Sequence, residues 1–429
     1  MAVAALFIMV STSAEAKTEL TPAALQQIKT VFVIAMENHN FTQPVTPTSP
    51  PQILGNPAAP YLNSLVTPGS PNSAQVSYAT RYYSAGVGVH PSEANYVWQE
   101  AATDFNFNSD ADPSAGTGNL YTVPHFTAQL NAAGIAWKNY QENLQMTTGP
   151  QFSAWGTSAS VINPYYGTGL YYYAAKHNPM VFFTDTQTQN VYELSALFSD
   201  LSNHSVGRYN WITPNLYNDA HNALPDGFTY GGTTYTGEQA AIAQGDNFLA
   251  TVVPQIMASA AYEDNGLIVI WWDETECGDT TNNTMPEIII SPLAKGNAYA
   301  SSVEYNHSSD LKTMAEIFGL GFVSNSIPTG AVNVVNGTTY NYVANVNDLS
   351  DMFKRLAIQG LTRLDTGGVR LTLMGLPGQS YTVLTSDTMA APLSEWTVIG
   401  GGTFGSGNEI FTDPAAVGHA GRYYVLRAE

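Results

Sequence analysis

The chain has 429 residues, of which 44% are hydrophobic and 11% charged, and its 34 acidic and 14 basic side chains give a formal net charge of −20. This length accommodates one large α/β domain and a smaller second domain. The acidic balance excludes binding of nucleic acid through a basic surface, and it argues against electrostatic docking on anionic lipid. A low content of charged residues favours an exported protein.

The N-terminal segment also favours export. Residues 1–16 are predicted to be a signal peptide, because an apolar stretch, Ala2 to Val10, is followed by Ala14-Glu15-Ala16, which has the small-x-small form of a cleavage site. The expected location is therefore secreted, periplasmic or on the cell surface. No later segment is apolar and long enough to span a membrane, so none is expected in the mature chain.

Cys277 is the only cysteine, so an intrachain disulfide is impossible. A small buried side chain is the favoured interpretation of this residue. The alternatives are a metal ligand and a redox-sensitive thiol.

Two apolar runs, Thr30–Met36 and Gly266–Trp272, each end in polar residues, Glu37-Asn38 and Asp273-Glu274. Runs rich in β-branched and aromatic residues, with little alternation, predict strands buried on both faces of a parallel sheet. In such sheets the ligand crevice lies beyond the carboxyl ends of the strands, where both polar pairs fall. Acidic side chains that converge there repel one another, so the pattern predicts a metal ion between them.

The rest of the main domain alternates helical and strand patterns. In chain order we expect a strand at 79–83, helices at 92–102 and 125–133, a strand at 135–140, a helix at 190–200, a strand at 209–213, a helix at 237–261, a strand at 287–291 and a helix at 311–318. Ser92 stands where the cap of the first helix belongs, and Ser309 or Asp310 where that of the last belongs. The alternation predicts an α/β fold with a mostly parallel central sheet flanked by helices.

The C-terminal part has a different pattern. Short strands separated by Gly- and Pro-bearing turns are predicted at 369–374, 380–384, 396–399, 409–411 and 422–427. This spacing predicts a small all-β sandwich at residues 363–429. The main domain is expected to cover residues 17–345, and residues 346–362 are expected to form a helix and linker.

Polar residues with catalytic or metal-binding potential follow strands or open helices in an order typical of metal-assisted phosphoryl transfer. They are Glu37, Asn38, Ser92, Asn95, Asp219, His221, Asp273, Glu274 and His307. A hydroxyl at a helix N-terminus lies where backbone N–H groups favour an anion, and carboxylates can hold a cation that activates it. Histidine can protonate a leaving oxygen or bind a metal.

Five motifs carry these residues in a fixed order. They are Met36-Glu37-Asn38-His39-Asn40-Phe41, His90-Pro91-Ser92-Glu93-Ala94-Asn95-Tyr96, Thr213-Pro214-Asn215-Leu216-Tyr217-Asn218-Asp219-Ala220-His221, Trp272-Asp273-Glu274 and Tyr305-Asn306-His307. The series resembles the bacterial phosphoesterase family, which contains phospholipases C and acid phosphatases, over roughly residues 31–320. The resemblance implies an alkaline-phosphatase-like fold.

The resemblance also implies roles for these residues. Ser92 would be the nucleophile that becomes phosphorylated, and Asn95 would bind the non-bridging phosphate oxygens. Asp219, His221 and His307 would lie across the phosphate, as ligands of a second metal or as leaving-group acid. The expected catalytic residues are Ser92, Asn95, His221 and His307, and the expected ligands of one or two divalent metal ions are Glu37, Asn38, Asp273, Glu274 and Asp219.

Structural interpretations compete with these assignments. Ser92 could simply cap its helix, and His221 and His307 could be hydrogen-bonded structural histidines. His90 is expected to shape a turn, and His125 and His177 are expected to be structural.

The expected function is hydrolysis of a small phosphorylated substrate by an exported, metal-dependent, acid-phosphatase-like phosphomonoesterase that works through a phosphoserine intermediate. The first alternative is a phospholipase C-type phosphodiesterase. A second alternative, of another class, is a catalytically inactive cell-surface or carbohydrate-binding protein.

Overall fold

The computed structural model describes residues 24–42, 52–84, 89–105, 112–113, 124–144, 162–163, 167–168, 172–275, 283–321, 323, 333–335, 338–340, 346–354, 357–375, 378–389, 391–392, 395–405, 408–417, 419 and 421–428. The predicted signal peptide and Cys277 lie outside these residues. The chain divides into two compact units, Leu25–Phe353 and a second unit that contains Lys354–Glu429.

Two adjacent parallel strands form the centre of the larger unit. β1 (Thr30–Met36) pairs with β11 (Gly266–Trp272) in register along its whole length, from Thr30↔Gly266 to Met36↔Trp272. Every residue of β11 is buried, and in β1 only Thr30 is partly exposed. Because both faces are covered, the strands show the uninterrupted apolar pattern of a parallel sheet core. Both predicted strands are confirmed.

The central sheet has eight strands in the order β13-β2-β12-β11-β1-β8-β4-β7. The further strands are β2 (Val76–Ala79), β4 (Trp137–Gln141), β7 (Val191–Glu193), β8 (Tyr209–Thr213), β12 (Glu287–Ile290) and β13 (Tyr299–Ser301). β12 alone runs antiparallel to its neighbours. The predicted fold class, a mostly parallel sheet flanked by helices with separate C-terminal β structure, is confirmed.

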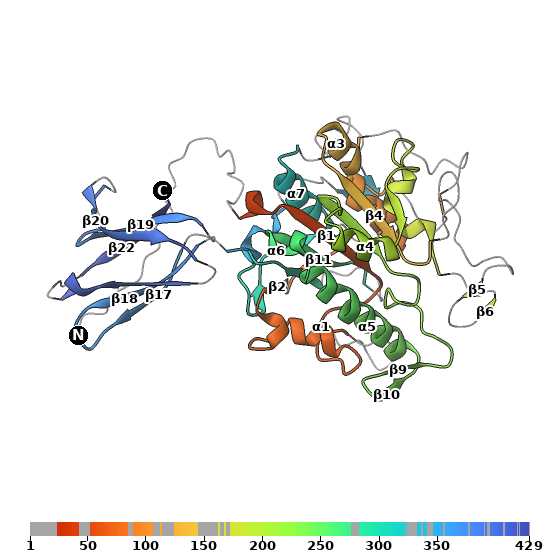
Figure 1. Cartoon of the computed structure of the whole chain (residues 1–429), viewed down its shortest axis with the longest axis horizontal. Coiled ribbons are helices and arrows are strands. Elements are labelled where there is room, and N and C mark those ends of the chain that lie inside the picture. The colour runs from red at the N-terminus through yellow and green to blue at the C-terminus, as the bar shows by residue number, and fades with distance from the viewer. Residues whose placement is uncertain are drawn as a thin grey trace. The chain divides into compact units, whose positions relative to one another are not determined.

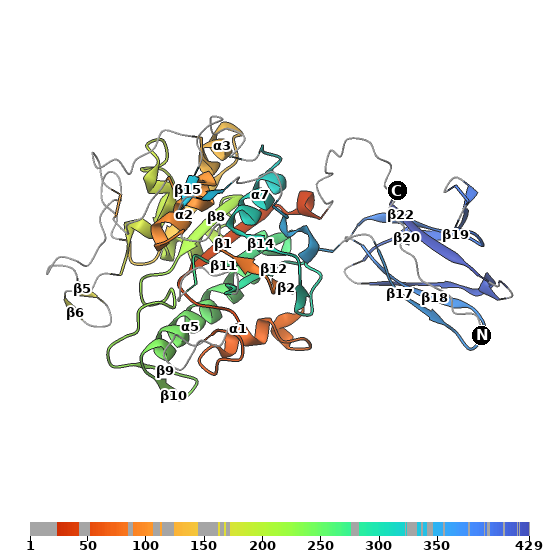
Figure 2. The same cartoon turned by 180° about the vertical axis from the view of Figure 1, so that it is seen from behind.

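Helices cover both faces of this sheet. They are α1 (Pro60–Leu65), α2 (Ser92–Ala101), α3 (Phe126–Ala132), α4 (Ser195–Ser202), α5 (Glu238–Met257), α6 (Ala260–Glu263) and α7 (His307–Phe318). In both Figure 1 and Figure 2, α1 and α5 lie along one side of the central strands, and α3 and α7 lie along the other. None of the helices in the described residues has the length and hydropathy needed to cross a bilayer.

The described residues also contain two-stranded sheets, and 3-10 helices in both units. The 3-10 helices are η1 (Leu25–Gln27), η2 (Pro71–Ser73), η3 (Ala175–His177), η4 (Pro179–Phe182), η6 (Leu349–Met352) and η8 (Pro414–Ala416). The small two-stranded sheets pair β3 (Tyr82–Tyr83) with β14 (Tyr305–Asn306), β5 (Ile162–Asn163) with β6 (Gly167–Thr168), β9 (Phe228–Tyr230) with β10 (Thr233–Tyr235), and β15 (Asn333–Val335) with β16 (Thr338–Tyr340).

Two helix predictions need correction. α7 begins at His307, four residues before the predicted start, because Asn306 caps it and the Ser309 hydroxyl accepts from the Asn306 N–H in a reciprocal capping box. The predicted helix at 190–200 is instead strand β7 followed by α4. β7 extends the sheet by pairing with β4, so sheet pairing overrides the local helical pattern there.

The C-terminal unit consists of two three-stranded antiparallel sheets. One contains β17 (Ala357–Arg363), β18 (Val369–Met374) and β21 (Glu409–Asp413), and the other β20 (Thr397–Thr403), β19 (Ser380–Ser386) and β22 (Tyr423–Ala428). Leu371 and Leu373 of β18 pack with Tyr381 and Val383 of β19. The two sheets therefore share one apolar core, as in a sandwich. β17 occupies residues that were expected to belong to the linker.

A pair of buried carboxyl groups lies between the sheet and α7. Glu287 of β12 and Asp310 of α7 are both buried, and the Tyr82 hydroxyl donates to Asp310 Oδ2. Burial raises the pKa of Asp310 to about 7. Burial, followed by the charge of Asp310, raises the pKa of Glu287 well above its usual value. At neutral pH the pair therefore holds a proton that the unfolded chain would release.

This pair predicts a pH-dependent stability. A carboxyl group whose pKa is raised by folding must lose its proton inside the folded protein when the pH is high, and this destabilises the fold. The free energy of unfolding therefore falls as the pH rises from about 4 to above 7. Glu287→Gln removes one such group, and we expect a free energy of unfolding higher than that of the wild type by about 1–3 kcal/mol at pH 8, with no gain at pH 4. Chemical denaturation at both pH values measures the difference.

The exposed Glu263→Gln is the matched control, and it should change stability equally at both pH values. A Glu287→Gln protein that is less stable than the wild type at pH 8 would show that the carboxylate is ionised and compensated.

Candidate active site

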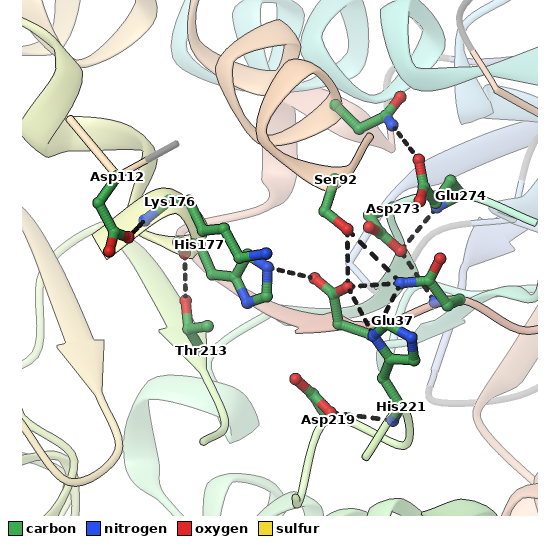
Figure 3. A network of polar contacts seen from close by, with 12 residues as sticks. Glu37, Ser92, Asp112, Lys176, His177, Thr213, Asp219, His221, Asp273 and Glu274 are labelled. Atoms are coloured by element: carbon green, nitrogen blue, oxygen red, sulfur yellow. Dashed lines mark hydrogen bonds and ion pairs between the residues drawn. The ribbon is translucent and has the colours of Figure 1, made fainter. Parts of the chain in front are cut away.

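The ends of β1 and β11 are tied together by the first polar residues after each strand (Figure 3). Asn38 has a left-handed backbone, with φ 48°, which turns the chain sharply after Glu37. Its N–H then donates to Asp273 Oδ1 at 3.0 Å, and the Glu274 N–H donates to the same oxygen at 2.7 Å. Asparagine tolerates this conformation better than most residues. The Asp273 carboxylate is thus fixed through one oxygen.

Asp219 reaches the same point from β8. The Glu37 N–H donates to the Asp219 carbonyl at 2.8 Å, and Asp219 Oδ1 accepts from the His221 N–H at 2.9 Å. This contact fixes one carboxylate oxygen of Asp219 and leaves the other, Oδ2, without a hydrogen-bond partner.

The loop that carries Asp219 is held by Glu142, which follows β4. The half-buried Glu142 carboxylate accepts from the Asn215 N–H at 2.8 Å and from the Asn218 side-chain amide at 2.9 Å. Burial raises the pKa of Glu142 to about 7. Glu142 is therefore a positioning residue for the Asp219 loop, a role that no motif in the sequence indicates.

Ser92 is the first residue of α2 and is only 4% exposed. Its Oγ donates to Glu37 Oε2 at 3.0 Å and lies 3.5 Å from Asn38 Nδ2. The cap position is occupied by Pro91, which makes no side-chain cap. The hydroxyl therefore does not cap its own helix, contrary to the structural alternative, and it lies at the positive end of the α2 dipole.

His177, at the end of η3, completes the group. Its ring stacks on Tyr96 with centroids 4.8 Å apart, and its Nε2 lies 3.3 Å from Glu37 Oε1. The Thr213 hydroxyl donates to the His177 carbonyl, so the sheet anchors the backbone of this histidine. His177 was expected to be structural, and its position beside Glu37 and Asp219 also makes it a possible metal ligand.

Glu37, His177 and Asp219 can each offer one ligand atom to a common metal ion, and these atoms lie within 4.8 Å of one another. Four buried atoms have no hydrogen-bond partner here: Glu37 Oε1, His177 Nε2, Asp219 Oδ2 and Asp273 Oδ2. The 3.3 Å approach of the first two is a close contact without hydrogen-bond geometry. Buried atoms left in this way are the expected signature of a cation site.

The electrostatics of the group agree with this fit. Burial, followed by the charges of Asp273 and Asp219, raises the pKa of Glu37 well above its usual value. Burial likewise raises the pKa of Asp219 strongly and that of Asp273 to about 6. It lowers the pKa of His177 well below 6.5, so the imidazole is neutral and able to bind a metal. These carboxylates can all be ionised together only if a cation accompanies them.

Glu274 and Asn95 lie beside this group in a separate contact. Glu274 Oε2 accepts from Asn95 Nδ2 at 3.1 Å and lies 2.5 Å from His90 Nδ1. Asn95 Nδ2 also donates to the Val89 carbonyl at 3.0 Å. The amide predicted to bind phosphate thus holds Glu274, and Glu274 is not a member of the Glu37–His177–Asp219 cluster.

The two histidines predicted to be catalytic differ in their surroundings. The His221 side chain is 40% exposed, and its Nδ1 lies 3.2 Å from Asn38 Nδ2. His307 is completely buried, with Nε2 2.6 Å from the Asp273 carbonyl and Nδ1 2.8 Å from the Tyr82 hydroxyl. Only His221 can meet a substrate without rearrangement.

The structure therefore brings together Ser92, Glu37, Asn38, Asp219, His221 and Asp273 of the expected residues, and adds His177. His177 stands in the segment Lys176-His177-Asn178-Pro179, which no strand pattern precedes, so the sequence did not place it at the end of a strand. A 3-10 turn that runs back beneath α2 cannot be inferred from periodicity.

The cluster predicts cation binding that depends on His177. We expect a divalent cation such as Mn²⁺ or Zn²⁺ to raise the unfolding temperature, and His177→Gln to weaken its binding by at least about tenfold, because one of the facing ligand atoms is lost. Isothermal titration calorimetry measures the affinity. The exposed His204→Gln is the control, and equal affinities of the His177 and His204 variants would exclude His177 as a ligand.

The chain is similar to several known proteins. The "Phosphatidylinositol-3-phosphatase" of Mycobacterium tuberculosis is 26% identical over 312 residues, which are 72% of this chain and 84% of that protein. The "Probable acid phosphatase" of Kluyveromyces lactis is 25% identical over 285 residues, 61% of this chain and 60% of that protein, so the chain spans less than two thirds of this relative. The lipoteichoic acid synthase LtaP of Listeria monocytogenes is a distant structural neighbour, with 11% identity, coverage of 82% of this chain and 83% of that chain, and a TM-score of 0.45.

The sequence profile described as "Phosphoesterase family" matches residues 73–321, more than half of the chain. This range contains Ser92, His177, Asp219 and Asp273, and Glu37 joins them in space from outside it. The chain therefore belongs to the phosphoesterase family and is a hydrolase of phosphoric esters.

Proposed function

We propose that the protein is an exported, metal-dependent phosphomonoesterase of the acid phosphatase type that acts through a phosphoserine on Ser92. The observation that carries the proposal is the position of Ser92 Oγ, 3.0 Å from Glu37 Oε2 at the edge of a buried carboxylate and imidazole cluster. A serine hydroxyl is a weak nucleophile unless a base or a cation activates it.

The residues of the chain are arranged for an in-line displacement at phosphorus. The Ser92 hydroxyl donates to Glu37 Oε2, so Glu37 is placed to accept the serine proton as Oγ attacks phosphorus. When bound by Glu37, His177, Asp219 and Asp273, a divalent cation supplies positive charge that favours the serine alkoxide and the phosphate oxygens. The bond from Ser92 Oγ to phosphorus forms as the bond to the leaving oxygen breaks.

His221 is suited to protonate the leaving oxygen. Asn38 Nδ2 donates to Glu37 Oε2 at 2.7 Å, which orients the amide, and the same group faces His221 Nδ1 at 3.2 Å. Transfer of a proton to the leaving oxygen requires the protonated ring, and Nε2, the nitrogen that Asn38 does not face, is the one that gives up its proton and leaves a neutral imidazole. Its ring is partly exposed, as a group that meets varied leaving groups must be. Water afterwards hydrolyses the phosphoserine and releases phosphate.

A monoester is preferred to a phospholipid diester as the substrate. The relatives from M. tuberculosis and K. lactis are both named phosphatases. The chain carries 34 acidic residues against 14 basic ones, which provides no broad positive surface for anionic lipid. A phosphomonoester therefore fits the protein better than a phospholipid diester.

Export is part of the proposal on sequence grounds. The apolar residues 2–10 and the Ala14-Glu15-Ala16 site support passage through a membrane and a secreted, periplasmic or surface location.

Substitution of the nucleophile tests the proposal. We expect Ser92→Ala to lower kcat for p-nitrophenyl phosphate by at least about 10³-fold, because no other group can form the covalent intermediate. Ser195→Ala is a matched control, since Ser195 is also the first residue of a helix, α4, but is exposed and bonded to Glu193. Steady-state kinetics with added divalent metal, and again with a chelator, measure both variants.

The substrate panel contains p-nitrophenyl phosphate, p-nitrophenyl phosphorylcholine and bis-p-nitrophenyl phosphate. Preference for either diester would favour the phospholipase C-type alternative. Turnover by Ser92→Ala equal to that of the wild type would assign the nucleophile to another residue, and no turnover of any substrate would favour a binding protein.

A further inference from the structure

His307 is held between two groups whose hydrogen-bonding roles are fixed by their chemistry. Its Nε2 lies 2.6 Å from the Asp273 carbonyl, which can only accept, so Nε2 carries a proton. Its Nδ1 lies 3.1 Å from Trp271 Nε1, whose N–H can only donate, so Nδ1 is an acceptor. The contacts thus select the Nε2–H tautomer of His307.

The aromatic surroundings fix the ring in place. The Trp271 indole N–H is shared with the Tyr82 hydroxyl at 3.0 Å, and that hydroxyl is 2.8 Å from His307 Nδ1. The rings of Trp271 and Tyr82 lie with centroids 5.0 Å and 5.6 Å from the imidazole. Tyr82 in turn donates to Asp310, one turn further along α7. Both ring nitrogens therefore point at protein groups, and neither faces the Ser92 hydroxyl.

The contact with Asp273 has a consequence for the cation cluster. Asp273 accepts from Asn38 and Glu274 through Oδ1 and from His307 through its carbonyl. The backbone and one carboxylate oxygen of Asp273 are both fixed. Its other oxygen, Oδ2, has no hydrogen-bond partner and lies beside the Glu37–His177–Asp219 cluster. Because His307 opens α7, this bond connects the helix to the turn after β11.

We propose that His307 is a positioning residue that orients Asp273 through its carbonyl, and that it is not the leaving-group acid. The inference deepens the proposed function and rests on it, because it assigns separate roles to the two histidines that the sequence grouped together. His221 keeps the proton-donor role, and His307 determines where the Asp273 carboxylate points.

Paired substitutions separate these roles. Glutamine at position 307 offers an N–H for the Asp273 carbonyl and an oxygen for the Trp271 indole, whereas alanine offers neither. We expect His307→Gln to retain kcat within about tenfold of the wild type and His307→Ala to lose about 10²-fold or more, because positioning needs the hydrogen bonds and not the titratable group. Both variants are compared with wild type by thermal unfolding, and the result for His307→Gln carries the test if His307→Ala does not fold.

The leaving group provides a second readout. An alkyl phosphate such as glycerol 2-phosphate needs a proton on its leaving oxygen, whereas p-nitrophenyl phosphate needs it far less. We expect the His307 variants to lose the same factor on both substrates and His221→Gln to lose at least about tenfold more on glycerol 2-phosphate. A His307→Gln protein as inactive as His307→Ala, with the larger loss on glycerol 2-phosphate, would overturn the proposal and make His307 the acid.

A third readout does not depend on turnover. Nuclear magnetic resonance of the ¹⁵N-histidine-labelled full chain, with His307 assigned by the difference from His307→Gln, reports which ring nitrogen is protonated. We expect the Nε2–H tautomer, and a proton on Nδ1 would overturn the inference. A wild type that binds cations and shows this tautomer but hydrolyses no ester would contradict the proposed function while leaving the tautomer assignment standing.

Discussion

The parallel pairing of β1 with β11 is the constraint on which the site depends. Because the two strands are in register from end to end, the residues that follow them, Glu37 and Asp273, must emerge side by side at one edge of the sheet. The Glu37 N–H then reaches across to the Asp219 carbonyl beyond β8, on the other side of β1. Three acids from three adjacent strands are thereby buried together, an arrangement that the fold imposes and that is unfavourable without compensation.

The compensation has two parts. Backbone N–H groups satisfy one oxygen each of Asp273 and Asp219, which leaves the second oxygen of each without a hydrogen-bond partner. His177, neutral because of its burial, adds a nitrogen ligand. Buried carboxylates whose pKa values are raised become strong ligands when a cation is present, so under the proposed function the repulsion that weakens the fold would favour metal binding. Ser92 lies where that positive charge can act on it.

The strands and their terminal acids were predictable because they depend on local patterns. The uninterrupted apolar runs at 30–36 and 266–272 identified the central strands, and the carboxyl-end rule placed Glu37 and Asp273 together. His177 was not predictable, because a short 3-10 turn carries it and only the tertiary path brings it under α2. The start of α7 was displaced for a similar reason, since Asn306 and Ser309 form a reciprocal cap that the apolar periodicity does not register. Contacts made by irregular backbone cannot be predicted from the periodicity of apolar residues.

The two histidines of the motif series show how environment separates residues of one type. Next to His221 an amide fixes one nitrogen and solvent reaches the ring, whereas His307 meets a carbonyl, an indole and a phenol and no solvent. Burial lowers the pKa of His307 to about 3, so the imidazole in its place behaves as a neutral donor and acceptor of fixed direction. A residue with those properties can determine the position of a neighbouring carboxylate but is poorly suited to exchange protons with a substrate. Proximity in the motif order therefore does not imply a shared role, and the difference follows from which atoms surround each ring.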